Sequence, residues 1–587
     1  MTKCDRVKRT LRSLTTALSF IYVVLLSVVG LGLHPTGALS QVAPSQVTPQ
    51  TLRPPAAPAQ DSVPSASREQ LQAPPGSEKL TFLVGRVVIK GAFPEFEIET
   101  RALTSAIERH RVSVSQIYEF ANSLEQIYAR AGYALVRVTV PPQKLNDRGP
   151  LEIVIIDGFI ERVQVDNVPD RVRSVVIARM ASLIGRRHIK LTEIERRLLI
   201  AADVPGLRLK STLTSGKAAG STLLVLEGTH RLVTAVTNID NRLPSSLGTW
   251  SYGGSVALNS AFGLGEQFYA SAQWGGDPAK IPDSSSPLRI LGAGAVLPLG
   301  SDGWILNPEY TNSRSHPVPV RGGLENIGQF ERYALRTSFP VIRTRATNLI
   351  LNGAYEYITQ SVALPLFSTD LNSDRYSALR VGAAYQAGLP WWGAALQSSA
   401  TFSQGVGGRG TADALASGIP LSRQGASPFF SKAALNAQIT QPLPEQYQLD
   451  FIGRFQTSFG TPLMVSEQFS LDGLQAVSAY PSGTLNVDEG GTLRIELSRS
   501  FALATSVPMV LSPYSFGSFG AGRLNEPTFV ELAVVRAGAL GFGARGNLEI
   551  PGGYQGMSLG LEIARQFSNL PHLPQGWRGQ VVMSLRY

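Results

Sequence analysis

The side chains that most often carry catalysis are few in this chain of 587 residues, and they are scattered. The single cysteine, Cys4, has no Cys/His cluster around it, and no histidine stands in a His-Glu-x-x-His or similar metal-ligand spacing. The six histidines are His34, His110, His188, His230, His316 and His572. The sequence therefore predicts no catalytic residue, no metal ligand and no cofactor, and we expect no enzymatic activity.

One glycine-rich motif could suggest nucleotide chemistry. The segment from Gly405 to Gly410 matches the G-x-G-x-x-G pattern of dinucleotide-binding loops. That motif acts only between a strand and a helix, where it places a pyrophosphate at the helix N-terminus. No such context surrounds it here, so we interpret it as a loop.

A different segment breaks an otherwise regular pattern and is the better candidate for a functional site. Residues 471–483, read as LDGLQAVSAYPSG, interrupt the alternation of apolar and polar residues between about Phe459 and Thr492. The simplest interpretation is a long external loop. Its role depends on the elements that position it.

Those elements are predicted to be membrane strands. From Arg231 to Tyr587, apolar and polar residues alternate with period two over segments of about ten residues, as tilted strands across a bilayer require. We count about sixteen segments, and only 16% of all residues are charged, against the usual quarter. A soluble all-β array such as a propeller is the alternative, but the charges on the polar faces favour an outer-membrane barrel over 231–587.

The last strand supports closure of that barrel. Val581, Met583, Leu585 and Tyr587 share one face of the terminal segment. An exposed apolar edge strand invites pairing with other chains, and closure of the sheet removes the edge. We expect this strand to pair with the first one, near residues 232–241.

The N-terminus has the features of an export signal. Basic residues precede an apolar stretch, and Ala38-Leu39-Ser40 fits a peptidase site, which predicts a signal peptide over 1–40; an uncleaved anchor is the alternative. Cleavage removes Cys4 and a net charge of +4, leaving +6 of the +10 on the mature chain. Without a basic run or patch, nucleic acid is not an expected partner.

Two small α+β units are predicted between the signal and the barrel. Residues 41–78 are rich in proline and predict a semi-extended linker. Residues 79–159 and 160–230 then each follow the order β-α-α-β-β. The helical parts of the first unit are 98–111 and the helix that the capping box Ser113/Gln116 begins; those of the second are 172–184 and the helix that Thr192 and Glu195 are expected to cap.

This domain order resembles a known family. The stretch from Gly132 to Val138, followed by Gly149 and residues 151–153, is similar to the first POTRA domain of two-partner secretion transporters (TpsB type, the ShlB/FhaC/HecB hemolysin secretion/activation family). The resemblance implies a barrel in the outer membrane of a Gram-negative bacterium, with POTRA domains in the periplasm.

The resemblance also implies function and partners. The barrel would recognise the N-terminal secretion domain of a large β-helical exoprotein, still unfolded, and would secrete this exoprotein; activation of a hemolysin or adhesin is one form of the function in this family. Outer-membrane lipid and the barrel-assembly machinery are further implied partners, with Tyr587 as the assembly signal. An insertase for other outer-membrane proteins, or a passive porin with a periplasmic binding module, remain alternatives.

Within this family, a loop folded into the lumen pairs an arginine at its tip with an aspartate on the barrel wall. By resemblance, the tip is Val477, Ser478, Ala479 and Tyr480, and the wall motif is Phe516, Ser518 and Gly520. Both charged members are replaced by serine. We therefore expect at most a neutral hydrogen bond between Ser478 and Ser518, and a loop held less firmly than in relatives.

Two further expectations concern the N-terminal part. An extended substrate segment could add to the strand predicted over 134–140, with candidate binding residues Tyr118, Tyr128, Leu135, Arg137 and Val138, although core packing explains the tyrosines as well. Relatives also carry an N-terminal helix that plugs the pore. Residues 41–78 are too rich in proline for a convincing one, since only 67–73 could form two helical turns.

Overall fold

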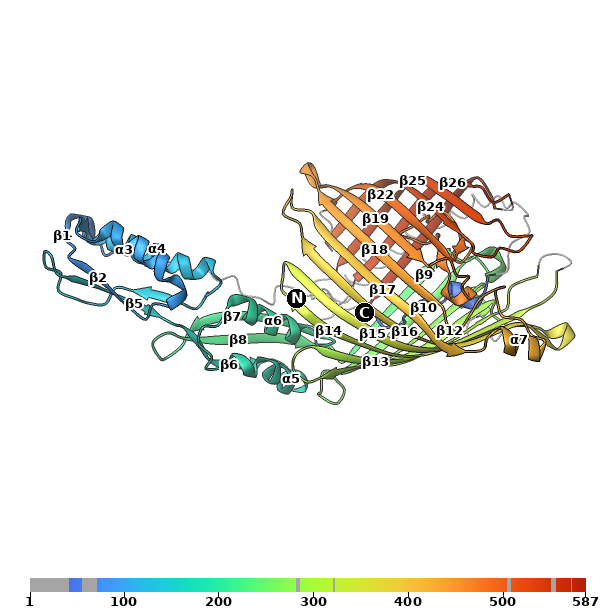
Figure 1. The fold of residues 1–587 in the computed structure, drawn as a ribbon, viewed down its shortest axis with the longest axis horizontal. Coiled ribbons are helices and arrows are strands. Elements are labelled where there is room, and N and C mark those ends of the chain that lie inside the picture. The colour runs from blue at the N-terminus through green and yellow to red at the C-terminus, as the bar shows by residue number, and fades with distance from the viewer. Residues whose placement is uncertain are drawn as a thin grey trace, which may run out of the picture.

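The computed structural model describes residues 42–54, 71–280, 285–319, 323–503, 508–549, 556–571 and 573–587. The predicted signal peptide, with Cys4, and linker residues 55–70 lie outside this part of the chain. Two α+β units precede a large barrel, and the second unit lies at one end of it (Figure 1). No helix in the described ranges is both long and apolar enough to cross a membrane.

The first unit is a three-stranded sheet with two helices on one side (Figure 1). Strand β5 lies in the centre, parallel to β2 and antiparallel to β4, while β1 and β3 form a separate ribbon. The predicted capping box begins α4, because the N–H of Gln116 donates to Ser113 Oγ (3.2 Å). The elements are β1 (Thr81–Leu83), β2 (Arg86–Lys90), α3 (Glu97–Ile107), β3 (Arg111–Ser113), α4 (Val114–Arg130), β4 (Arg137–Thr139) and β5 (Pro150–Ile156).

The second unit repeats this order and docks on the barrel. Its elements are β6 (Phe159–Asn167), α5 (Asp170–Met180), α6 (Leu191–Ala202), β7 (Leu207–Ser215) and β8 (Ser221–His230), with sheet order β6-β8-β7. The predicted cap at Thr192 is wrong, because α6 already begins at Leu191, after the N-cap residue Lys190. Ion pairs of Asp203 with Arg343 and of Arg197 with Asp302, each 2.6 Å, join this unit to turns of the barrel.

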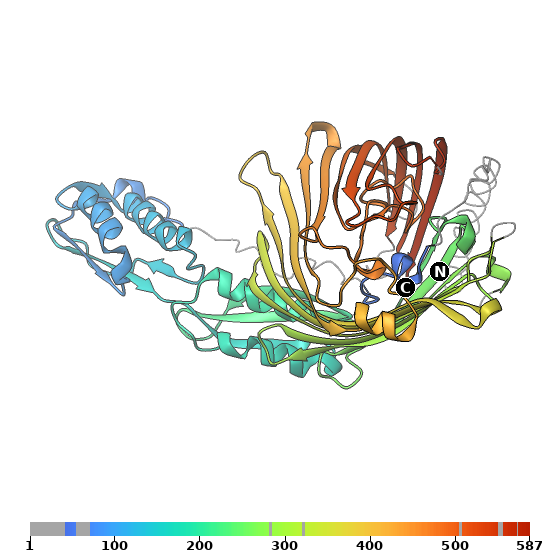
Figure 2. The same cartoon turned by 45° about the vertical axis from the view of Figure 1, so that its right-hand side comes forward.

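Sixteen antiparallel strands close the barrel, which confirms the predicted fold class (Figures 1 and 2). Strand β23 continues β22, since both pair with β24. The strands are β9 (Val233–Asp240), β10 (Ser251–Asn259), β11 (Gln267–Gly275), β12 (Leu288–Leu299), β13 (Trp304–Ser315), β14 (Ile327–Arg343), β15 (Thr347–Leu364), β16 (Thr369–Gly388), β17 (Ala395–Gly408), β18 (Ser431–Pro442), β19 (Tyr447–Thr457), β22 (Glu489–Arg499), β23 (Phe501–Leu503), β24 (Met509–Arg523), β25 (Val534–Glu549), β26 (Gly556–Ser568) and β27 (Trp577–Arg586).

The seam of the barrel lies between its first and last strands, as the terminal alternation predicts. Strand β27 pairs with β9 in the register Met583 to Ile239. The last residue completes the seam: the N–H of Ala235 donates to the Tyr587 carbonyl (2.9 Å), and the Tyr587 N–H donates to the Ala235 carbonyl (2.8 Å). The role of Tyr587 as an assembly signal stays a prediction.

The barrel encloses two further pieces of the chain. Residues 463–488 leave the wall after β19 and return to it at β22, and residues 42–54 lie against the inner face of β11 to β14. Figure 2 shows both within the outline of the barrel. The polar faces of the strands, which point inward, therefore contact other parts of the same chain.

Candidate functional site

The segment that interrupts the strand pattern folds into a braced loop inside the barrel. We name residues 463–488 the lumen loop. It begins with a turn of 3-10 helix (Val465–Glu467) and contains a short hairpin of β20 (Phe469–Ser470) and β21 (Asn486–Val487). The carboxylate of Asp472 accepts the N–H groups of Gly483 (3.1 Å), Thr484 (2.9 Å) and Leu485 (2.8 Å). Because the loop packs against the inner wall, it is not the simple external loop that the sequence alone suggested.

The predicted loop tip is buried against the wall that carries the predicted partner motif. Val477, Ser478, Ala479 and Tyr480 are each at most 2% exposed. A Cβ added to Gly520 would lie 3.2 Å from Cγ2 of Val477, so the two backbones approach closely because this position has no side chain. Phe516 belongs to the same apolar cluster as the tip. The structure thus brings the two motifs together.

The predicted contact between the two serines is not made. The Ser478 hydroxyl donates to Glu562 and accepts a hydrogen bond from Arg494 Nη1 (2.8 Å). The Ser518 hydroxyl has no hydrogen-bond partner in the described part of the chain. Charged groups on strands outside both motifs bind the tip instead, so the loss of the Arg–Asp pair does not leave the tip unattached. That the loop is held less firmly than in relatives stays a prediction.

The arginine beside the loop tip comes from the barrel wall. Arg494 on β22 lies directly across from Ser518 in the register and is 1% exposed. Its guanidinium lies 2.8 Å from Glu562, 3.0 Å from Glu496 and 3.7 Å from the centre of the Phe516 ring. Arg545 donates to Glu496 as well (2.8 Å).

We name Arg494, Glu496, Arg545 and Glu562 the Arg494 cluster. Two cations face two carboxylates, so the charges of the cluster are balanced; Arg545 is half-exposed and the other three side chains are buried. Main-chain groups of the tip are bound separately, since Gln566 donates to the Ala479 carbonyl (2.7 Å) and Gln580 donates to the Ser478 carbonyl. The tip is therefore held through both its backbone and one hydroxyl.

The second piece inside the barrel is the N-terminal segment, residues 42–54. It has one short helical turn, α2 (Pro44–Val47), and is otherwise extended. Val42 is buried at its start in an apolar cluster with Leu288 and Ile290 of β12 and with Leu243 and Leu247 of the connection between β9 and β10. A Cβ added to Gly483 of the lumen loop would lie 2.7 Å from Cγ1 of Val42, so the two pieces also touch each other.

The wall binds the backbone of the N-terminal segment through charged groups. Arg332 donates to the Pro49 carbonyl (2.9 Å) and Arg336 to the Gln50 carbonyl (2.8 Å). Glu309 accepts the N–H of Leu52 (3.0 Å) and the hydroxyl of Thr51 (2.9 Å). The linker expectation is therefore wrong for residues 42–54. Proline excludes a long helix but leaves the carbonyl groups that arginines bind, so an extended segment can fill the lumen.

A line of ion pairs joins this segment to the base of the lumen loop. Arg336 lies 2.9 Å from Glu309 and from Glu356, Arg380 lies 2.9 Å from Glu356, and Arg380 lies 2.6 Å from Glu467 in the loop. Lys432 adds a second cation 2.7 Å from Glu467. We name this series the charge ladder, and its members come from β13, β14, β15, β16, β18 and the lumen loop.

Sequence reasoning missed the Arg494 cluster and the charge ladder. The sequence did offer a sign of these sites: few residues are charged (16%), yet some of them lie on the polar faces of predicted strands. Their partners depend on strand register and on which residues enter the lumen. In the described ranges no group of three or more His, Cys, Asp or Glu side chains is placed to hold a metal ion.

The proposed substrate-binding residues of the first unit have different environments. Tyr128 is fully buried, and its hydroxyl accepts the N–H of Phe93 (3.2 Å); burial raises the pKa of its phenol. It is a core residue, and only Tyr118 of the two tyrosines is half-exposed. Leu135 is buried too, in the apolar cluster of the second unit.

The edge strand proposed for substrate addition is short and partly occupied. Strand β4 has three residues, and its position at the sheet edge leaves one side unpaired. The half-exposed Arg137 donates to Glu125 (2.9 Å), and the N–H of Val138 donates to the same carboxylate (3.0 Å). A substrate strand would have to displace Glu125 from this N–H.

The geometry defines the class of protein: a closed sixteen-stranded β-barrel with two α+β units before it and a lumen filled by its own chain. Comparison with family models agrees. The model of the haemolysin secretion/activation protein ShlB/FhaC/HecB matches residues 219–542, and the ShlB-type POTRA domain model matches 82–158. The chain therefore belongs to the ShlB/FhaC/HecB family.

Individual relatives are distant but cover most of the chain. The hemolysin transporter protein ShlB of Serratia marcescens is 25% identical over 68% of this chain and 69% of its own length. The outer membrane transporter CdiB of Dickeya dadantii is 23% identical over 68% of each chain. Among solved structures, CdiB from Escherichia coli covers 93% of this chain and 94% of its own, with a TM-score of 0.66 and 19% identity, which supports the fold.

These findings establish the general function. The chain is an outer-membrane transporter of two-partner secretion, and its POTRA domains lie in the periplasm. Members of the family act with secreted partner exoproteins, which they secrete or activate. The strand ends near the second POTRA domain therefore face the periplasm, and the opposite ends face the cell exterior.

Proposed function

We propose that the exoprotein crosses through the barrel lumen, and that the lumen loop and the N-terminal segment close this path at rest. The observation that carries the proposal is that both pieces lie inside the wall and are bound to it by buried charged groups. Transport then requires that both pieces leave their positions, at least in part. The Arg494 cluster and the charge ladder hold the closed state.

The partner is a large β-helical exoprotein that arrives unfolded in the periplasm and presents an N-terminal secretion domain. The first POTRA domain recognises it, with Arg137 and Tyr118 as the accessible candidates and the Val138 N–H as a site for strand addition once Glu125 moves. No catalytic step is involved. Folding of the exoprotein outside the cell provides the direction of transport.

Charged contacts are a favourable way to hold the lumen loop and the N-terminal segment, because both must be released during transport. Buried ion pairs contribute little net stability relative to apolar packing, because desolvation offsets much of their attraction. When the closing pieces leave, water and the passing chain can solvate the same wall charges. An apolar contact of equal area would be exposed to water on release, and no new interaction would compensate for the lost burial.

A reversible crosslink tests the closure. The variant Val477→Cys/Gly520→Cys places two thiols where the loop tip meets β24, since a Cβ at position 520 lies next to the Val477 side chain. The native Cys4 lies in the predicted signal peptide, so no other thiol is expected in the mature chain. Cells that co-express a candidate partner exoprotein are assayed for it in the medium.

We expect the oxidised variant to block secretion and a reducing agent to restore it. Gly520→Cys alone is the matched control, because it adds the same side chain without a crosslink. Secretion at the parental rate through a fully oxidised barrel would show that the loop does not need to leave the wall.

Recognition has its own test. Arg137→Ala and Tyr118→Ala are compared for capture of the partner's secretion domain, with Arg101→Ala on α3 as an exposed control in the same domain. We expect weaker capture for the first two variants only. Equal capture by all three would move recognition to the second POTRA domain.

A further inference from the structure

The outer face of the barrel carries an arginine, Arg565, that forms no ion pair in the described part of the chain. Arg565 on β26 points outward and is exposed, whereas its neighbour Glu562 points inward and binds Arg494 (2.8 Å). In the described part of the chain Arg565 takes part in no ion pair, and its guanidinium lies 5.6 Å from the centre of the Phe567 ring. An unpaired charged side chain on the lipid-facing surface destabilises a membrane barrel. The residues around Arg565 should therefore show what compensates its charge.

The strand register places Arg565 in an apolar field. Reading across the strands, its row is Ile495, Gly517, Leu540, Arg565 and Trp577. The row on the extracellular side is Leu493, Phe519, Gly538 and Phe567, and the row on the periplasmic side is Leu497, Ser515, Phe542, Ile563 and Gly579. Arg565 is the single charge among these fourteen outward positions, all of which are described.

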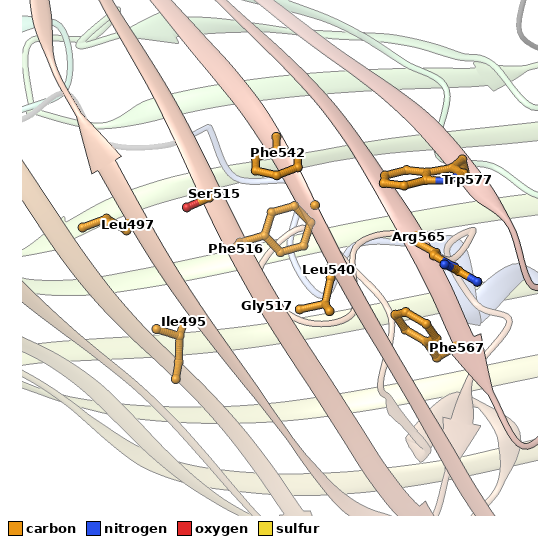
Figure 3. A pocket seen from close by; sticks show the side chains of 11 residues that line it. Ile495, Leu497, Ser515, Phe516, Gly517, Leu540, Phe542, Arg565, Phe567 and Trp577 are labelled. Carbon is orange, nitrogen blue, oxygen red and sulfur yellow. The ribbon is translucent and has the colours of Figure 1, made fainter.

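The same field contains a groove. Gly517 and Gly541 are among the residues that line it, and larger side chains stand on both sides of Gly517, leaving a hollow of about 580 Å³ (Figure 3). Figure 3 shows Arg565 and Trp577 together on one side of the hollow, with Leu540 and Phe542 between them and Ile495. Its shape suits a flexible hydrocarbon chain better than a rigid protein surface.

Position along the strand indicates which part of a lipid meets Arg565. β26 ends at Ser568 on the extracellular side, three residues further, or about 10 Å along the strand. A long arginine side chain reaches over much of that distance, and Trp577 is typical of the membrane–water boundary. Arg565 can therefore reach headgroups of the outer leaflet while its stem lies among acyl chains.

We propose that this groove binds a phosphate-bearing lipid of the outer leaflet, with the phosphate at Arg565 and an acyl chain over Gly517. The guanidinium offers a planar pair of donors that matches two phosphate oxygens, and the phosphate neutralises the single charge of this apolar field. The indole N–H of Trp577 is placed at the same boundary to donate to the headgroup. The bound lipid spans β22 to β27, the strands whose inner faces hold the lumen-loop tip.

Native mass spectrometry of the full-length protein in a non-ionic detergent tests this site. The probes are bisphosphorylated lipid A, the same lipid after enzymatic dephosphorylation, and inorganic phosphate. We expect one tightly held equivalent of the phosphorylated lipid, at least tenfold weaker binding for Arg565→Gln, and tenfold weaker binding of dephosphorylated lipid to the parent protein. Inorganic phosphate at millimolar concentration is not expected to compete.

Two further variants distinguish the contribution of the groove to lipid binding from that of a positive charge alone. Gly517→Val fills the floor, where an added Cβ would lie 3.1 Å from the movable end of Leu540, and should weaken binding of both lipids. Arg523→Gln is the matched control, since Arg523 is an exposed arginine near the extracellular end of β24 that pairs with Glu489 (3.2 Å). Heat-modified migration of each variant checks that the barrel is folded.

Three results would overturn the proposal. One is equal retention of phosphorylated lipid by Arg565→Gln and the parent. Another is full displacement of the lipid by inorganic phosphate, which would indicate a simple anion site. The third is equal binding of dephosphorylated lipid, which would leave Arg565 without a role in the groove.

Discussion

The hydroxyl of Ser478 is the smallest group whose removal tests how the loop tip is held. It bridges Arg494 and Glu562, while the backbone of the tip is bound separately by Gln566 and Gln580. Ser478→Ala therefore removes two hydrogen bonds to charged groups and leaves the rest of the attachment in place. Arg494 and Glu562 remain paired with each other, so no buried charge is left alone.

The magnitude follows from that arrangement. A hydrogen bond to a charged group contributes about 1.5–3 kcal/mol, and the two bonds share one hydroxyl, so we take this range for both together. With a tenfold change for each 1.4 kcal/mol, the equilibrium between held and released tip should shift about ten- to a hundredfold. Single-channel recordings in planar bilayers should show correspondingly more frequent openings.

Ser482→Ala is the matched control for this measurement. Ser482 lies on the same loop and binds through its main-chain N–H, which donates to the Arg242 carbonyl (2.8 Å) and is kept in the variant. We expect its recordings to match those of the parent. Identical recordings for Ser478→Ala and the parent would refute the assignment of the Arg494 cluster as a fastening for the loop tip.

Three further predictions concern other parts of the closure and the barrel. Deletion of residues 42–54 should raise mean conductance in the same bilayer assay, because it empties the lumen beside β11 to β14; an unchanged conductance would contradict this. Glu467→Gln removes the carboxylate paired with Lys432 and leaves Arg380 with Glu356 alone, at a cost of about 3–5 kcal/mol, and should lower the temperature at which the barrel unfolds in a heat-modified migration assay; Glu445→Gln, on an exposed turn, should not. Removal of Tyr587 deletes two main-chain hydrogen bonds at the seam and should reduce the amount of barrel in outer-membrane fractions before it reduces secretion per barrel.

Local patterns in the sequence determined the elements and their order. Alternation over about ten residues is enough to predict membrane strands, because side chains on opposite faces of a strand meet different solvents. The Ser113/Gln116 capping box and the glycine at 132, where φ is +94°, fix the two ends of α4 by short-range geometry alone. The sixteen strands and the closing role of the last one follow from the same reasoning.

The contents of the lumen were decided by contacts between residues far apart in the chain. Ser478 meets Arg494 and Glu562 only because the register of β22 and β26 brings these side chains to the same place on the inner wall. No local pattern around position 478 contains that information. Arg494 on the wall therefore contacts the loop tip at the position where relatives are expected to have an arginine on the loop itself.

The N-terminal segment shows the same division between sequence and tertiary structure. Its prolines correctly exclude a long helix, and without partners such a segment would be a linker. Inside the barrel, Glu309, Arg332 and Arg336 bind its main-chain groups, which every sequence possesses. By itself the sequence determined that this segment could not fold alone; the tertiary structure decided where it binds, because its binding groups are backbone atoms and the residues that select them lie more than 250 positions away.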